Sequence, residues 1–113
     1  MDCKRYDIHW VEMDPARGSE MRKTRPAVIV SMDVLNRVVE TVVVCPITSK
    51  LHPGWRARLP VKVSGKSAEI AADQIRVVSK DRVRGKIGRL SESNAAALRR
   101  LLGEMYAEEC DAG

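Results

Sequence analysis

The stretch from Glu40 to Thr48 places the strongest limit on what this chain can fold into. It reads Glu-Thr-Val-Val-Val-Cys-Pro-Ile-Thr, an apolar run that is rich in β-branched residues. Such a run predicts a strand that is buried on both faces. Pro46 cannot donate a backbone hydrogen bond, so we expect a bulge or an edge position near the end of this strand.

Other short strands are predicted before and after this one. Residues 5–12 alternate in polarity, which predicts a strand with Tyr6, Ile8 and Trp10 on one face and assigns Trp10 to the core. A turn or a single helical turn is expected at 33–36. The remaining predicted strands cover residues 26–31, 59–63, 68–71, 73–79 and 86–90.

The apolar spacing becomes helical after Ser91, which is a suitable N-cap. A helix is therefore predicted from Ser91 to about Glu108. Its apolar positions are Leu98, Leu101, Leu102, Met105 and Tyr106. The 113 residues thus predict one domain (1–113) that is mainly β, a small barrel or sandwich of five to seven strands with a C-terminal helix.

Composition narrows the classes of function. Twenty basic and 15 acidic side chains give a net charge of +5, which moderately favours a polyanionic partner. No apolar run is long enough to span a membrane, and the first residues lack the apolar segment of a signal peptide. Three cysteines without metal-ligand spacing favour a reduced, cytoplasmic protein, with Cys45 as a buried apolar residue.

The stretch from Arg17 to Ser31 joins a polar, basic loop to an apolar strand. Pro26 fixes the backbone at the start of the strand and biases Arg25 toward an extended conformation. A guanidinium held at a strand entrance can present paired donors to a phosphate. The alternative is that Arg25 is one surface arginine among many, and that Pro26 only begins an edge strand.

If the strands 26–31 and 40–48 are neighbours, Arg25 and Thr48 flank one cleft. Trp55 follows in the next loop, where it could either stack on an unpaired base or anchor the loop on the barrel. Basic residues would form the rim of the cleft: Arg22, Lys23, Lys50, Arg56, Arg58, Lys80, Arg82, Arg84 and Lys86.

Metal and nucleotide cofactors are not expected. His9 and His52 are the two histidines of the chain, and neither has a second ligand at metal-binding spacing. Arg17-Gly-Ser-Glu lacks both the glycine spacing and the Lys-Ser/Thr ending of a phosphate-binding loop.

Several motifs follow one another in a familiar order: Arg5-Tyr-Asp-Ile-His-Trp-Val, Gly18-Ser-Glu20, Lys23-Thr-Arg25-Pro26-Ala-Val-Ile-Val, Cys45-Pro-Ile-Thr48-Ser, Asp73-Gln-Ile-Arg-Val-Val-Ser and Lys86-Ile-Gly-Arg-Leu90. In these motifs the chain resembles the MazF/PemK family of toxin–antitoxin toxins over nearly its whole length. The resemblance implies a small SH3-like barrel that forms a symmetric homodimer. It also implies a cognate antitoxin with a flexible segment that occupies the RNA groove.

The implied activity is a metal-independent endoribonuclease that cuts single-stranded RNA at a short sequence. Cleavage would leave a 2′,3′-cyclic phosphate and a 5′-hydroxyl and would inhibit translation. Carried over by position, Arg25 and Thr48 are catalytic and Glu20 lies nearby. Cleavage by the 2′-hydroxyl also needs a proton acceptor, for which Glu20 is the candidate base; the alternative for Glu20 is a loop salt bridge to Arg22 or Lys23. The loops 14–24 and 49–57 would grip RNA, while residues 52–58 and 64–67 leave the preferred RNA sequence open. The RNA-binding candidates are Ser19, Arg22, Lys23, Ser49, Lys50, Trp55, Arg56, Gln74, Arg82, Arg84 and Lys86.

Two other functions are compatible with the same architecture. One is a non-enzymatic gyrase poison like the CcdB toxins, which act through the C-terminal helix and an aromatic terminus. Here Tyr106 is the last aromatic residue and the chain ends Glu-Glu-Cys-Asp-Ala-Gly, which disfavours that route. The other is a non-catalytic nucleic-acid-binding barrel, which the charge alone supports. The apolar face of the predicted helix could serve either the core or the twofold interface of a dimer.

Overall fold

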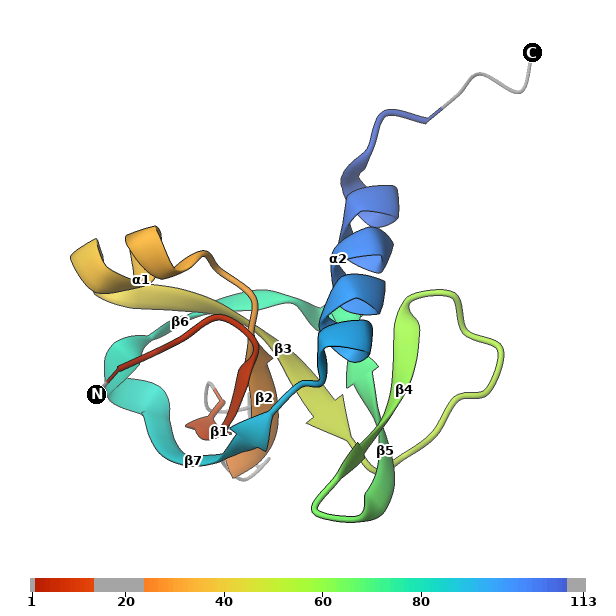
Figure 1. The fold of residues 1–113 in the computed structure, drawn as a ribbon, viewed down its shortest axis with the longest axis horizontal. Coiled ribbons are helices and arrows are strands. Elements are labelled where there is room, and N and C mark those ends of the chain that lie inside the picture. Colours follow the sequence, from red (N-terminus) through yellow and green to blue (C-terminus); the bar gives the residue numbers. More distant parts are fainter. Residues whose placement is uncertain (1, 14–23, 110–113) are drawn as a thin grey trace, which may run out of the picture.

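The computed structural model describes residues 2–13 and 24–109. Its described part is a single curled antiparallel sheet with a long helix at one side (Figure 1). This confirms the predicted fold class, a small barrel-like β domain with a C-terminal helix. The strands are β1 (Asp7–Glu12), β2 (Thr24–Ile29), β3 (Thr41–Thr48), β4 (Arg58–Val63), β5 (Lys66–Ala71), β6 (Arg76–Ser79) and β7 (Val83–Arg89).

Two α-helices and two 3₁₀ turns complete the described part of the fold. They are α1 (Asp33–Val38), η1 (Ala72–Gln74), η2 (Lys80–Arg82) and α2 (Glu92–Tyr106). The predicted strand 73–79 is therefore only partly right, because its first residues form η1. The predicted turn at 33–36 is a short helix. Among the described residues no helix has the length and apolar character needed to cross a membrane.

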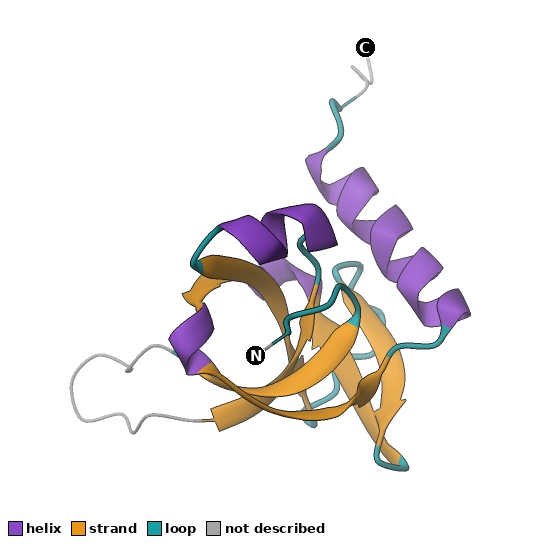
Figure 2. Cartoon of the chain, turned by 60° about the vertical axis from the view of Figure 1, so that its left-hand side comes forward, coloured by secondary structure: helices purple, strands orange, loops and turns teal. Residues whose placement is uncertain are grey.

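β3 is the strand on which the sheet is built. The strands pair in the order β4-β5-β3-β2-β1-β7, and β6 also pairs with β3. Figure 2 shows how strongly the strands curl. Residues 41–44 of β3 pair with β6, whereas Ile47 and Thr48 pair with β5. Pro46 is thus in a central strand and not at an edge, contrary to one of the two expectations. It is tolerated because it lies where β3 changes partner, so its missing N–H removes no bond from either ladder.

Both faces of β2 and β3 are buried, as the apolar run predicts. One core cluster lies under α2 and contains Val28, Cys45 and Leu98. The other lies on the opposite face and contains Ile29, Val44 and Val11. Burial raises the pKa of Cys45 to about 12, which keeps its thiol neutral.

α2 begins where predicted. The Ser91 hydroxyl caps it by accepting a hydrogen bond from the backbone N–H of Asn94 at 3.2 Å. Leu98 is fully buried, and Leu101, Leu102 and Met105 pack against the same core cluster. Most of the apolar face of the helix therefore packs on the core, one of the two uses left open by the sequence, whereas Tyr106 is 64% exposed.

The assignment of Trp10 to the core is wrong. Trp10 lies on the same face of β1 as the buried Ile8, but its side chain is 45% exposed. The core cluster under α2 includes Ile8 and leaves out Trp10. The pairing of β1 with β7 is also irregular on both sides of His9. Alternation in sequence predicts the face correctly but cannot show how far the covering helix extends along it.

Candidate functional site

Arg25 and Thr48 line the same groove. β2 and β3 are neighbours, and their register pairs Ala27 with Pro46. The same register, continued for two more residues, brings Arg25 opposite Thr48. The groove holds about 380 Å³. The structure therefore brings these two predicted site residues together, as expected if their strands were adjacent.

The Arg25 guanidinium is half-buried at the start of β2. No described residue forms a hydrogen bond or an ion pair with it. By contrast, Arg58 on β4 and Arg84 on β7 are each ion-paired with a carboxylate. Lys66 lines the same groove, and no carboxylate is among its described lining residues. The groove is therefore positive and suited to an anionic group such as a phosphate.

The Thr48 hydroxyl is oriented by the backbone that follows it. Its oxygen accepts a hydrogen bond from the Lys50 N–H at 3.1 Å. Because this contact uses a lone pair of the oxygen, the hydroxyl proton remains available for donation to a substrate. Ser49 adds a second hydroxyl to the groove wall.

The far wall of the groove is the β4–β5 hairpin. The sequence links its residues 64–67 to RNA preference, but apart from Arg58 at the rim it predicts no hairpin residue at the cleft. Val63 and Lys66 pair across a two-residue turn, Ser64-Gly65, with both residues at positive φ. This geometry is typical of tight hairpin turns. The remaining lining residues come from β1, β2, β3 and β7: Trp10, Pro26, Ile47 and Ile87, with Ser67 and Ala68 from β5.

A charged network holds the loop between β3 and β4. Glu69, the partner of Thr48 in the β3–β5 ladder, is buried. Its carboxylate accepts hydrogen bonds from the His52 N–H at 2.9 Å and from Arg58 Nη1 at 3.1 Å. Arg58 Nε donates to Asp73 Oδ1 at 2.8 Å. These bonds raise the pKa of Arg58, and the hydrogen bond to Asp73 has the largest effect.

Arg58 was expected at the rim of the cleft, and this is wrong. Its side chain is only 6% exposed, because it is enclosed by its carboxylate partners and by Trp55, whose ring centre is 4.9 Å from the guanidinium carbon. Trp55 also stacks on His52 with ring centres 3.9 Å apart. Both contacts match the interpretation of Trp55 as a loop anchor, although half of its surface stays exposed.

Other RNA-binding candidates lie outside the groove. Lys50 and Arg56 are exposed on the loop after β3, and Gln74 is exposed in η1. On the β7 side, Arg84 Nη2 is 2.7 Å from Glu12 Oε2, and Lys86 Nζ is 3.4 Å from the buried Asp7 Oδ2. Arg82 Nη1 donates to the Met13 carbonyl at 3.4 Å. Glu20, Ser19, Arg22 and Lys23 lie outside the described residues.

Both histidines have structural surroundings. His9 is buried in β1, and its Nδ1 donates to the Arg84 carbonyl at 2.9 Å because a carbonyl can only accept. His52 stacks on Trp55. Within 2–13 and 24–109, no three His, Cys, Asp or Glu side chains are grouped so that they could hold a metal ion.

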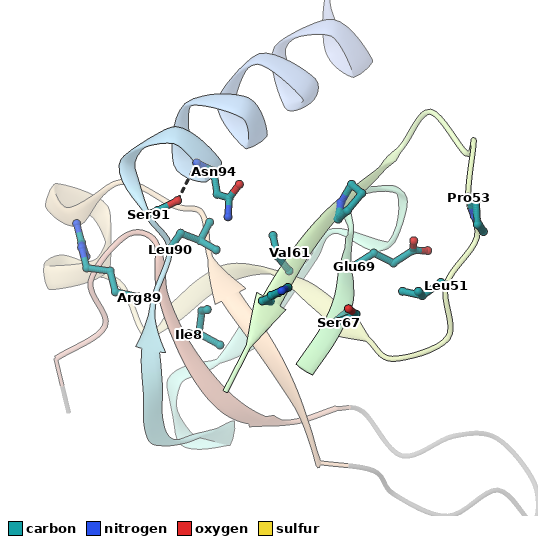
Figure 3. Close-up of a pocket in the computed structure, with 13 residues that line it drawn as sticks. Ile8, Leu51, Pro53, Val61, Ser67, Glu69, Arg89, Leu90, Ser91 and Asn94 are labelled. Carbon is teal, nitrogen blue, oxygen red and sulfur yellow. Dashed lines mark hydrogen bonds between the residues drawn. The ribbon is translucent and has the colours of Figure 1, made fainter. Parts of the chain in front are cut away.

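A second, larger hollow of about 730 Å³ adjoins the groove (Figure 3). It lies between the first turn of α2 and the β4–β5 hairpin, and it shares Ser67 and Ala68 with the groove. Leu51 and Pro53 from the loop after β3 and Leu90 before α2 make it mainly apolar. The hairpin therefore has a hollow on each side.

Comparison with known proteins agrees with this architecture. Residues 4–106 match the family model of PemK-like, MazF-like toxins of type II toxin–antitoxin systems. The chain is 35% identical to the endoribonuclease MazF9 of Mycobacterium tuberculosis, over 84% of this chain and 88% of that protein. It is 33% identical to the endoribonuclease MazF of Staphylococcus epidermidis, over 80% and 79% of the two chains.

Solved structures share the fold. A MazE–MazF crystal structure from Deinococcus radiodurans superposes with a TM-score of 0.81 at 22% identity, covering 96% of this chain and 99% of the other. The toxin MazF-mt6 of M. tuberculosis gives 0.76 at 22% identity, covering 92% and 99%. The match of the family model over residues 4–106 and the sequence identities agree, and the chain belongs to the PemK-like, MazF-like toxins of type II toxin–antitoxin systems.

Proposed function

We propose that the groove of Arg25 and Thr48 is the active site at which this toxin-family endoribonuclease cuts single-stranded RNA, at a short sequence and without a metal. The observation that supports this most directly is the pairing of an arginine free of described partners with an oriented hydroxyl in one positive groove. The RNA supplies its own nucleophile, the 2′-hydroxyl next to the scissile phosphate. The products are then a 2′,3′-cyclic phosphate and a 5′-hydroxyl.

Arg25 stabilises the transition state in this proposal. Attack by the 2′-oxygen builds negative charge on the non-bridging oxygens of the phosphate. A guanidinium can donate two parallel hydrogen bonds to these oxygens. Arg25 stays protonated, so it is not a base; it can hydrogen-bond to the leaving 5′-oxygen and so assist proton donation to that oxygen from water.

Thr48 orients the phosphate. Its oxygen is held by the Lys50 N–H, so the hydroxyl can donate to a non-bridging oxygen that Arg25 also contacts. Glu20 is the proposed base that removes the 2′-hydroxyl proton. It belongs to the stretch 14–24, outside the described residues; the resemblance implies only that it lies near Arg25 and Thr48, and its role as a base is a chemical inference.

The test is cleavage of a defined RNA by purified protein, with and without a chelator, followed by analysis of the product ends. We expect Arg25→Ala to lower cleavage by at least ~10²-fold, the scale of losing one preorganised donor. Arg100→Ala is the matched control, because Arg100 is exposed on α2 and does not line the groove. An RNA with a 2′-deoxy scissile nucleotide should bind and stay intact. Products with a 3′-hydroxyl and a 5′-phosphate would refute the mechanism.

A cognate antitoxin is the expected protein partner. Structures of related toxins with their antitoxins support it, including the MazE–MazF complexes from D. radiodurans. We expect a flexible antitoxin segment to occupy the RNA groove and so to block cleavage. We expect the protein to act in the cytoplasm, where mRNA is found and the free thiols of Cys3 and Cys45 stay reduced.

The homodimer that the family resemblance implies needs an exposed apolar face. The face of α2 is used by the core, whereas α1 exposes Val34, Leu35 and Val38, and Val39 follows it. We therefore place the twofold interface over α1. Sedimentation at micromolar concentration should give a dimer for the wild type and a monomer for Val38→Lys. A wild-type monomer would contradict this assignment.

A further inference from the structure

The two tryptophans of the chain differ in how their rings are engaged. The Trp55 indole already stacks on His52 and lies against the Arg58 guanidinium, and it is not among the residues that line the groove. Trp10 has no described aromatic or cationic partner, and it lines the groove with Arg25 and Thr48. The ring that is available inside the groove is therefore that of Trp10.

Trp10 is exposed on a rigid element. Its neighbours in β1, His9 and Val11, are 2% and 0% exposed, and its partner in the β1–β2 ladder is Pro26. Leaving an indole 45% exposed between such residues forgoes the free energy that its burial would provide. The backbone holds the ring in place without covering it, so a ligand that covers it needs little further ordering of the protein.

We propose that Trp10 is the stacking platform for one nucleobase next to the scissile phosphate, and that it helps to determine which RNA is cut. The proposal rests on the proposed function, because it places the base beside the phosphate held by Arg25 and Thr48. A base is the favoured occupant because the same groove offers a cation for its phosphate, and the hydroxyls of Ser64 and Ser67 for its polar edge. The platform accepts any flat base, and the hydroxyls add selectivity.

The first experiment measures kcat/KM on the RNA that the wild type cuts and on copies with one abasic nucleotide at each position around the cut. We expect Trp10→Leu to lower kcat/KM by about ten- to a hundredfold on the intact RNA, the usual range for one stacked base. Trp10→Phe keeps an aromatic ring and should remain within about threefold of the wild type. At one abasic position, Trp10→Leu should cause no further loss, because the base that it stacks is already absent.

Trp55→Leu is the matched control, since it removes an indole from the neighbouring loop. Any loss that it causes should be the same for every abasic RNA. In a Trp55→Phe background, Trp10 is the sole tryptophan, and its emission should be quenched by an RNA made uncleavable by a 2′-deoxy scissile nucleotide. Circular dichroism of each variant checks that the fold is retained.

The outcomes separate this proposal from the proposed function. If the wild type fails to cut RNA, the proposed function is wrong, and the proposal for Trp10, which rests on it, is wrong as well. If the wild type and Trp10→Leu cut equally well, or if Trp10→Leu loses the same factor at every abasic position, the platform alone is overturned. Unchanged RNA cleavage with weakened antitoxin binding would assign Trp10 to a protein partner and would also overturn it.

Discussion

The buried ion pair between Arg58 and Glu69 allows a quantitative prediction about the loop after Thr48. The pair has an N–O distance of 3.1 Å, with side chains that are 6% and 4% exposed. At an effective dielectric constant near 20, the Coulomb attraction at this distance is about 5 kcal/mol. Desolvation of both charges offsets a large part of it. Removal of one partner from a buried pair costs roughly 3–5 kcal/mol when the other charge is left alone.

Arg58 would not be left alone, because Asp73 remains bonded to its Nε. We therefore expect Glu69→Gln to lower the free energy of unfolding by about 2 kcal/mol, below the range for an isolated buried charge. The glutamine oxygen can still accept from the His52 N–H, so the loss reports mainly the missing charge. Because Glu69 pairs with Thr48, we also expect weaker RNA cleavage, chiefly through KM.

The assay is urea unfolding of the wild type, Glu69→Gln, Arg58→Met and the double variant. The coupling energy from this cycle should exceed 1 kcal/mol. The matched control is the cycle of Glu12→Gln and Arg84→Met, a pair whose arginine side chain is 55% exposed, for which we expect roughly 0.2–1 kcal/mol. A coupling between residues 58 and 69 of ~0.5 kcal/mol or less, the limit for independent sites, would refute the reasoning.

Three further predictions concern single residues. Burial raises the pKa of Cys45 from 9.0 to about 12. The stabilisation by the neutral thiol is therefore complete below pH 9, and above pH 9 the free energy of unfolding falls by up to ~1.4 kcal/mol per pH unit. Urea unfolding of a Cys45→Ala variant should lack that slope. Leu98→Ala should cost roughly 2–5 kcal/mol of unfolding free energy, because the side chain is fully buried under α2; a loss below ~1 kcal/mol would contradict that packing. Thr48→Val should lower kcat by about ten- to a hundredfold, the worth of one hydrogen bond to a charged group, and unchanged single-turnover cleavage would remove Thr48 from the mechanism.

The elements that the sequence predicts well are those with a clear local pattern of apolar residues. The apolar run of β3 and the helical spacing after Ser91 each correspond to an element with nearly the expected bounds. The adjacency of Arg25 and Thr48 followed from one topological assumption, that their strands are neighbours, and the β2–β3 ladder confirms it.

Two of the errors concern what covers a side chain. Trp10 has the right spacing for a core residue, but the core cluster under α2 does not reach its end of β1. Arg58 looks like one more surface cation until the β4–β5 pairing brings Glu69 beside it. Its carboxylate partners are 11 and 15 positions away in the chain, a separation that no local pattern contains.

The attachment of the β4–β5 hairpin has a consequence for how this protein can change. Among the described residues, six pairs hold the two strands to each other, whereas two pairs, Ile47–Ile70 and Thr48–Glu69, join the hairpin to the rest of the sheet. At the tip, the φ of +80° at Gly65 would strain any other residue, whereas Lys66 and Ser67 beside it are exposed, so changes at these two positions need not disturb either core. In the proposed active site, this wall can therefore change with little penalty in folding, while the strands that carry Arg25 and Thr48 stay fixed. On that proposal, part of the RNA preference can change without any change in the cutting residues.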